Sequence, residues 1–263
     1  MAITLRSRRE IELMRQAGAV VARVLSRLTE MAKPGVSTGE LDRLASRMTA
    51  EAGAEPLFKG VRGPRGVRPF PGVICASINQ EVVHGIPSDH RVLKEGDILS
   101  LDFGVRLNGY CGDAAVTLGI GRIGPLQQRL IDVTEEALNL AIKHMRPQVR
   151  WSQIADMMQR HVEQAGFSVV RQFVGHGIGT KMHEDPKVPN FVSKDLLEDD
   201  IVLTEGMVLA VEPMVNAGTH EVTTLSNGWT VVTSDGQCSA HFEHTIAVTA
   251  SSCEVLTLDR CPR

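Results

Sequence analysis

The sequence predicts an α+β fold in which two related halves, at about residues 10–120 and 125–250, pack into one domain spanning residues 1–263. Three observations predict this fold. Amphipathic helical segments precede apolar strands in both halves, the order of these segments repeats, and the first half contains a strong β-hairpin signal. A chain of this length could form one large domain or two small ones. The repeat favours a single domain whose halves are related by a pseudo-two-fold axis.

The first half begins with two predicted helices. Residues 9–31 carry apolar side chains at a helical period, and the Lys-Pro-Gly sequence at 33–35 ends that segment. Ser37 and Glu40 form a capping-box pattern, which predicts that a second helix begins here and stops near Gly53.

These two helices occur a second time in the chain. KPGVSTGELDRLASRMTAEAG (33–53) aligns without gaps with RPQVRWSQIADMMQRHVEQAG (146–166). Residues 126–145 form an amphipathic segment before the second copy, as residues 11–31 do before the first. Two further helices are therefore expected at the start of the second half.

Strand segments repeat in the same order. LKEGDILSLD (93–102) aligns with LTEGMVLAVE (203–212), so that Asp102 is aligned with Glu212. VHGI (83–86) aligns with GHGI (175–178), so that His84 is aligned with His176. Each match alone is weak, but their shared order favours a duplication. Residues at equivalent strand ends are then expected to face one another across a central cleft.

An Asn-Gly pair at 108–109 is the strongest short hairpin signal in the chain. A two-residue loop there pairs Gly104 with Asp113, so that Asp102 lies on the same face as Asp113 and about 7–8 Å from it at the backbone. Taken singly, either aspartate could be a turn residue or an edge-strand charge. Two buried carboxylates on one apolar face need a cation. Arg106 lies on that face too, so a salt bridge is an alternative to a metal.

Three further segments favour a metal over the salt bridge. Glu212 lies in the apolar run VLAVEPM, Glu243 lies in SAHFEHTIAVT, and His176 lies in FVGHGIG, whose glycines let the backbone approach a site closely. The basic residues nearby are too few to neutralise these groups. Oxygen-rich ligands with one nitrogen suit two divalent ions that share bridging carboxylates.

Composition and other motifs exclude several classes of protein. A formal charge of −3, with 43% hydrophobic and 22% charged residues, is typical of a soluble globular protein without bulk attraction to nucleic acid or anionic membranes. No apolar run approaches the roughly 20 residues of a membrane span. Five cysteines without a C-x-x-C pair favour reduced thiols. The dinucleotide-binding, H-E-x-x-H and G-x-S-x-G motifs are not matched.

Seven motifs, in order, resemble those of the type I methionine aminopeptidases: VVHGIP (82–87), LSLDFG (99–104), GYCGDAAVT (109–117), GHGIG (175–179), MHEDP (182–186), VEPMVNAG (211–218) and FEHTIAVT (242–249). The resemblance extends from about residue 4 to residue 250. It implies the pita-bread fold, in which two pseudo-symmetric halves surround a central antiparallel sheet. It also implies a bacterial or organellar type I enzyme that removes the initiator methionine, with a preference for a small second residue.

The resemblance implies two divalent metal ions held by five ligands: Asp102, Asp113, His176, Glu212 and Glu243. Asp113 and Glu243 would bridge the ions, His176 and Glu212 would complete one site, and Asp102 would complete the other. The ions could be Co, Mn, Fe, Zn or Ni, because affinity and cellular availability select different metals.

The resemblance also assigns catalytic roles. Glu212, or a carboxylate near it, would carry the proton of the attacking water to the leaving amine. His183 would stabilise the oxyanion, and His84 would hold the scissile amide nitrogen. Without the resemblance, His84 could equally be a hydrogen-bonded loop histidine.

An apolar slot for the flexible thioether of the leading methionine is implied as well. Its lining would be Phe70, Cys75, Met214 and Trp229. Three departures from the family pattern affect this pocket. The loop FKGVRGPRGVRPFPG (58–72) is longer and more basic than usual, Met182 replaces a common Phe, and His241 replaces the usual Gln. The loop is either simply solvated or contacts ribosomal RNA or the nascent chain.

Two other functions fit this fold. An X-Pro-cleaving aminopeptidase or prolidase usually carries an additional N-terminal domain, whereas only a short segment precedes the first predicted helix here. A non-catalytic binding protein is disfavoured because all five ligand positions and both histidines have the required residue types. We expect a cytoplasmic monomer that acts on peptides and nascent polypeptides with N-terminal methionine. Transient ribosome contact is possible, and no membrane partner is expected.

Overall fold

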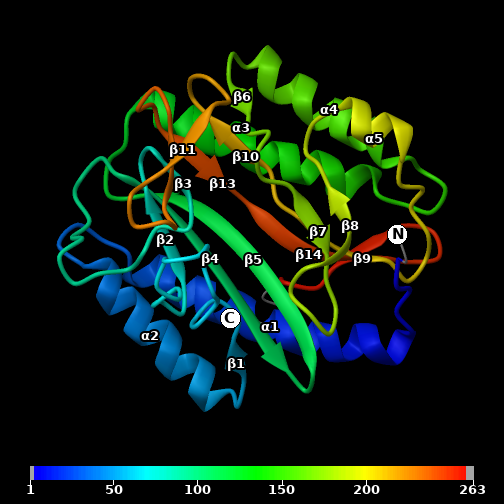
Figure 1. Cartoon of the computed structure of the whole chain (residues 1–263), viewed down its shortest axis with the longest axis horizontal. Coiled ribbons are helices and arrows are strands. Elements are labelled where there is room, and N and C mark those ends of the chain that lie inside the picture. The colour runs from blue at the N-terminus through cyan, green and yellow to red at the C-terminus, as the bar shows by residue number, and fades with distance from the viewer. Residues whose placement is uncertain (1–2, 259–263) are drawn as a thin grey trace.

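A nine-stranded antiparallel sheet forms the centre of the computed structural model, which describes residues 3–258 (Figure 1). Its main path follows the order β1-β4-β5-β14-β9-β7-β8, while β2 pairs with β4 and β15 pairs with β14. These strands are Glu55–Pro56 (β1), Cys75–Ile78 (β2), Ile98–Leu107 (β4), Tyr110–Gly119 (β5), Gly175–Gly177 (β7), Glu184–Val188 (β8), Val208–Val211 (β9), Glu243–Val248 (β14) and Cys253–Val255 (β15). Both halves of the sequence supply strands to one sheet, which confirms the expected α+β class with a central antiparallel sheet.

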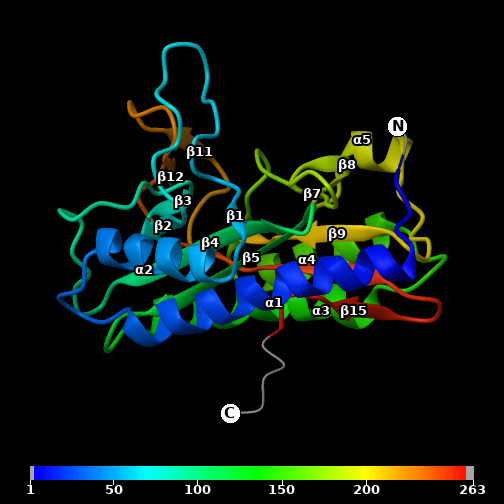
Figure 2. The ribbon, with the colours of Figure 1, turned by 90° about the horizontal axis from the view of Figure 1, so that it is seen from below.

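Helices cover one side of this sheet. They are Arg8–Met31 (α1), Thr38–Glu51 (α2), Pro125–His144 (α3) and Trp151–Gln164 (α4), whereas the short Lys194–Glu198 (α5) lies on the opposite side, next to β8. Figure 2 shows α1, α3 and α4 on one side of the sheet. The apolar faces of α1 and α2 pack on β2, β4 and β5, and those of α3 and α4 pack on strands of the second half. The four helices predicted from hydrophobic periodicity are therefore confirmed, each within a few residues of its expected ends.

Two three-stranded sheets complete the structure. One has the order β13-β10-β6 and the other β11-β12-β3. Their strands are Glu81–Val83 (β3), Ser168–Val169 (β6), Met214–Asn216 (β10), Val222–Thr224 (β11), Val231–Thr233 (β12) and Ser239–His241 (β13). Within residues 3–258, no helix has the combination of length and apolar character that crossing a bilayer requires. Cys75, Cys111, Cys238 and Cys253 carry free thiols, as expected, and Cys261 lies outside the described residues.

The two halves repeat in detail as well as in outline. Helices α2 and α4 both have 14 residues and occupy the aligned segments. Just before them, Gly35 and Gln148 occupy aligned positions and both have a positive φ, of 93° and 69°. The Gly35 amide donates to the Leu93 carbonyl, and the Gln148 amide donates to the Leu203 carbonyl, both at 2.8 Å. These shared contacts agree with the predicted repeat.

One aligned pair, His84 with His176, is wrong. In the strand alignment Ser100 corresponds to Ala210. In the sheet Ser100 pairs with Ser77 of β2, whereas Ala210 pairs with His176 of β7. The structural counterpart of His176 is therefore Ser77, and His84 follows β3 outside the large sheet. A histidine beside a glycine is too short a pattern to fix the correspondence.

The hairpin register agrees with the prediction. Strands β4 and β5 pair Leu107 with Tyr110 and Gly104 with Asp113. Asn108 and Gly109 both have a positive φ, of 52° and 81°, as a two-residue hairpin turn of type I′ requires.

Substitution of Ser37 should destabilise the protein measurably. The Ser37 hydroxyl accepts a hydrogen bond from the amide of Glu40 at the start of α2. Its loss in Ser37→Ala should lower the free energy of unfolding by about 1 kcal/mol. Urea unfolding followed by circular dichroism would measure the change.

The repeat offers a matched control. Arg150 occupies the equivalent N-cap position of α4, where the described chain has no side-chain cap hydrogen bond. Arg150→Ala should therefore change the free energy of unfolding by less than about 0.5 kcal/mol. Equal losses in the two variants would contradict the role assigned to Ser37.

Candidate metal and catalytic site

A cavity of about 240 Å³ is lined by residues from both halves of the chain. All eleven side chains expected at the site from the sequence reach it: Phe70, Cys75, His84, Asp102, Asp113, His176, His183, Met214, Glu212, Trp229 and Glu243. The structure therefore brings together every residue that the sequence interpretation selected. The local strand register explains how the acidic groups come to lie side by side.

Three acidic side chains are set by pairing around one residue of β5. Asp102 of β4 and Glu243 of β14 both pair with Ala115, from opposite sides. Directly paired residues point to the same face, and so does Asp113, two residues from Ala115. Three neighbouring strands thus present three carboxylates to one face of the sheet. Glu212 immediately follows β9, the next strand in the sheet.

Asp113 is held by its surroundings. The Thr245 hydroxyl donates to the Asp113 carbonyl at 2.8 Å and accepts from the Asp113 amide at 3.0 Å. Opposite it, a Cβ at Gly104 would lie only 2.8 Å from Asp113 Oδ1, so glycine leaves room for the carboxylate. The position of Asp113 is therefore fixed by strand register and by a buried hydroxyl rather than by a flexible loop.

Three of these carboxylates each have one buried oxygen without a hydrogen-bond donor. Among residues 3–258, no partner is found for the buried atoms Asp102 Oδ1, Asp113 Oδ1 and Glu243 Oε1. The salt bridge considered for Arg106 is wrong, because its guanidinium pairs with Glu55 of β1 at 3.7 Å. Unsatisfied buried oxygens are costly, so this cluster fits divalent cations as partners.

Burial favours the protonated form of each carboxyl group. It raises the pKa of Asp102 to about 7. It also raises the pKa of Asp113, to which the charge of Asp102 adds. Burial, followed by the charges of the other acidic groups, raises the pKa of Glu212 and Glu243 well above their usual range. A bound cation would oppose these shifts, because it stabilises the ionised carboxylates.

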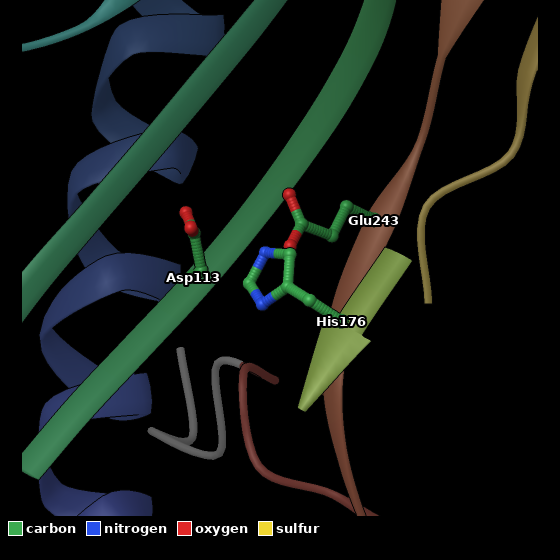
Figure 3. A group of neighbouring side chains, drawn as sticks. All are labelled: Asp113, His176 and Glu243. Carbon is green, nitrogen blue, oxygen red and sulfur yellow. The ribbon is translucent and has the colours of Figure 1, made fainter. Parts of the chain in front are cut away.

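Figure 3 shows Asp113, His176 and Glu243 converging from β5, β7 and β14. Their potential ligand atoms all lie within 4.8 Å of one another, a geometry suited to one metal ion. His176 Nδ1 lies 2.9 Å from the Gly177 carbonyl, to which it can donate. Burial, with the nearby His183, lowers the pKa of His176 to about 4. The neutral ring therefore turns the lone pair of Nε2 toward the cavity.

Glu212 lies between two imidazoles. His176 Nε2 is 3.5 Å from Glu212 Oε1, and His241 Nε2 is 3.7 Å from Glu212 Oε2. His241 is 2% exposed, and the Thr117 hydroxyl bonds both its amide and its carbonyl at 2.8 Å. The sequence singled out His241 only as a departure from glutamine. Its contact with Glu212 depends on cross-strand packing, for which the sequence carries no local signal.

Two further histidines face the cavity from loops. The ring centroid of His183 lies 4.3 Å from that of His176. His84 adopts a φ of 59°, an uncommon backbone conformation that often marks a functional site. Burial lowers the pKa of both rings, that of His84 to about 4. Each is therefore neutral at pH 7 and can donate one hydrogen bond to a bound molecule.

An apolar pocket adjoins the acidic cluster. Phe70 and Trp229 pack edge to face with ring centroids 5.3 Å apart, and Cys75 pairs with Asp102 between β2 and β4. The lining also includes residues that the sequence interpretation did not select: Phe58, Val61, Val83, Phe173 and Val174. Phe173 and Val174 precede His176 in the FVGHGIG segment, which is the one signal that could have identified them. Met182 and His241 line the same cavity.

Comparisons with known proteins agree with this geometry. Residues 12–250 match the model of metallopeptidase family M24. The chain is 48% identical over 249 residues to methionine aminopeptidase 1 of Bacillus subtilis, an alignment covering 95% of this chain and 96% of that relative. The crystal structure of methionine aminopeptidase from Thermotoga maritima matches with a TM-score of 0.91 and 40% identity, over 98% of this chain and 100% of that one.

More distant structures share the fold alone. The Xaa-Pro dipeptidase from Bacillus anthracis matches with a TM-score of 0.74 and 22% identity. The match covers 98% of this chain but 62% of the dipeptidase. The pita-bread fold expected from the sequence motifs is thereby confirmed, with its curved antiparallel sheet common to both groups of enzymes.

The raised pKa of Asp102 predicts a pH-dependent stability in protein treated with a chelator. Folding raises this pKa from 3.8 to about 7, so the folded state retains a proton that the unfolded chain releases above about pH 4. The retained proton stabilises the folded state relative to the ionised form, and this stabilisation is lost as the pH rises from about 4 to about 7. Asp102→Asn should therefore gain stability relative to wild type across that window, by on the order of 4 kcal/mol.

Urea unfolding in EDTA at pH 4.5, 6 and 8 would test this dependence. The matched control is Asp132→Asn, which removes an exposed carboxylate from α3. A difference between Asp102→Asn and wild type that stays constant with pH would contradict the assignment of the raised pKa to Asp102.

Proposed function

The chain belongs to metallopeptidase family M24, and from this membership we propose that it is a methionine aminopeptidase. It removes the initiator methionine from nascent proteins and peptides and prefers a small second residue. The observation that carries the proposal is the single cavity in which an acidic cluster and neutral imidazoles adjoin an apolar pocket. Hydrolysis of a first peptide bond needs these elements side by side.

Five residues would hold two divalent ions: Asp102, Asp113, His176, Glu212 and Glu243. Asp113 and Glu243 would be shared between the two ions. The unpartnered oxygens of Asp102, Asp113 and Glu243 support this assignment. Bound divalent ions would supply the Lewis acidity that polarises the scissile carbonyl and makes water nucleophilic at neutral pH. Co, Mn, Fe, Zn and Ni all suit such ligands.

Glu212 is the proton carrier. Its carboxylate would take the proton of the attacking water and deliver it to the leaving amine, acting first as general base and then as general acid. The flanking rings of His176 and His241 restrict the orientation of its carboxylate.

His183 and His84 act on the substrate. The neutral His183 ring donates a hydrogen bond to the oxygen of the scissile carbonyl, where negative charge develops. His84, packed edge to face against Phe173 at 5.8 Å and against Trp229 at 6.4 Å, holds the scissile amide nitrogen. Both rings are neutral at pH 7, so they provide donors without adding charge to the cavity.

The methionine side chain enters the apolar end of the cavity. Its lining is Phe70, Cys75, Met214 and Trp229. A flexible, polarizable thioether makes favourable contacts with aromatic edges and sulfur, and the pocket supplies both. A branched or charged first residue would leave voids or unpaired charge there. The pocket therefore selects methionine at the first position.

The setting of the reaction follows from the substrate. Initiator methionine is present on newly made chains, so we propose that the enzyme acts as a monomer in the cytoplasm, with transient contact to the ribosome. The X-Pro-cleaving alternative has weaker support, because an Xaa-Pro dipeptidase matches at 22% identity whereas methionine aminopeptidase 1 of Bacillus subtilis matches at 48%. A binding protein without activity would not need the neutral histidines beside the acidic cluster.

Peptide hydrolysis distinguishes these functions. With Mn²⁺, Co²⁺ or Fe²⁺ present, the protein should release methionine from Met-Ala-Ser and leave Ala-Pro-Ala intact, because the first pocket fits a thioether. Mass spectrometry of the products would measure both. Cleavage of the proline peptide alone would indicate the X-Pro activity, and no hydrolysis with any of the metals would indicate a binding protein.

Removal of a shared ligand should abolish activity and metal uptake together. Asp113→Ala or Glu243→Ala removes a carboxylate from both ions, so metal content measured by elemental analysis should fall along with turnover. His183→Ala serves as a comparison, since it should lower kcat by about 100-fold or more while the metal content is retained. Retention of two ions per chain by both carboxylate variants would refute the ligand assignment.

A further inference from the structure

Residues 58–72, here termed the basic loop, connect β1 and β2 beside the cavity. The loop contains Lys59, Arg62, Arg65 and Arg68 and no acidic residue. All four basic side chains are exposed, and the three arginines form no ion pair with any residue in the described part of the chain. The loop therefore presents unneutralised positive charge to the solvent.

The base of the loop is part of the cavity wall. Phe58, Val61 and Phe70 all line the cavity. The Gly60 amide donates to the Phe70 carbonyl at 2.8 Å, and the Phe70 amide donates to the Val61 carbonyl at 2.9 Å. These bonds close the base of the loop, and Arg62 directly follows Val61, a residue of the cavity wall.

The loop is also fastened to the wall across from it. Trp229 Nε1 donates to the Arg68 carbonyl at 2.8 Å, and the Trp229 ring packs against Phe70. After the loop, the Asp42 carboxylate of α2 accepts the amides of Val73 and Ile74. Figure 2 shows the cyan loop standing out from the body next to β11 and β12. These contacts fix the base of the loop beside the cavity, and its charged tip stands out into the solvent.

A bound substrate would bring later residues close to this charge. When methionine occupies the apolar pocket, the second residue lies at the acidic cluster and the following residues leave the cavity. An extended chain advances about 3.3 Å per residue, and arginine side chains are long. We propose that Arg62 and Arg65 of the basic loop recognise acidic side chains at the third and fourth positions of the substrate. This inference rests on the proposed peptidase function.

The features of the loop favour a peptide over RNA. Its two aromatic residues, Phe58 and Phe70, are 8% and 3% exposed, so neither is available at the tip to stack on a base. The chain as a whole has a net charge of −3, which opposes general attraction to nucleic acid. The loop charge instead lies where a substrate peptide must emerge, and proximity strengthens its attraction to acidic residues.

Three peptides test the proposal: Met-Ala-Asp-Glu-Ser, Met-Ala-Ser-Ser-Ser and Met-Ala-Lys-Lys-Ser. At about 0.02 M salt, kcat/KM should be about 3-fold to 10-fold higher for the acidic peptide than for the lysine peptide, and the ratio should approach one at about 0.5 M salt. The double variant Arg62→Gln, Arg65→Gln should bring the low-salt ratio close to one. The matched control is Arg23→Gln with Arg47→Gln, which removes two exposed arginines from α1 and α2 and should leave the ratio unchanged.

Each other outcome overturns the proposal in a recognisable way. Equal kcat/KM for the three peptides would refute recognition by the loop while leaving the peptidase function intact. No hydrolysis of any peptide would refute the peptidase function itself. An equal loss of the ratio in the control variant would show an effect of total charge. If the loop variant kept the ratio but lost co-sedimentation with ribosomes, the ligand of the loop would be RNA phosphate.

Discussion

The enclosure of four carboxyl groups in one cavity is the constraint on which the rest of the structure depends. Like charges this close cannot all remain ionised without a partner, and burial raises the pKa of each group. Three of their oxygens have no hydrogen-bond donor within residues 3–258. Divalent cations resolve both problems at once, so binding of metal and stability of the fold are expected to be coupled.

The strand register fixes the positions of the carboxylates in this cluster. Asp102, Ala115 and Glu243 lie in line across β4, β5 and β14, so one pairing error would turn a carboxylate to the other face. The Thr245 hydroxyl bonds the backbone of Asp113, and the Thr117 hydroxyl bonds that of His241. Groups placed on rigid strands keep their spacing better than groups on loops. The loops instead carry His84 and His183, which line the cavity and which we propose to contact the substrate.

Local rules of sequence explain what could be predicted. The Asn-Gly turn sets the β4–β5 register, so the shared face of Asp102 and Asp113 was available from the sequence alone. The apolar surroundings of Glu243 marked it as a candidate ligand, but its pairing with Ala115 joins distant segments and has no local signal in the sequence. The salt-bridge alternative for Arg106 stayed open because its actual partner, Glu55, lies in a two-residue strand with no periodic signal. The contact between His241 and Glu212 likewise requires tertiary packing.

Burial determines which side chains of the molecule are neutral and which are charged. Inside the cavity it lowers the pKa of His84 and His176 to about 4 and that of His241 to about 3, so the imidazoles are neutral. It also drives the carboxyl groups toward their neutral form, and bound cations would return only those groups to the ionised state. Neutral donors and ionised ligands then coexist in one small volume. Outside the cavity, the arginines of the basic loop lie exposed to the solvent. Solvation therefore separates two tasks. The buried groups carry the chemistry, and the exposed arginines carry the electrostatic selection.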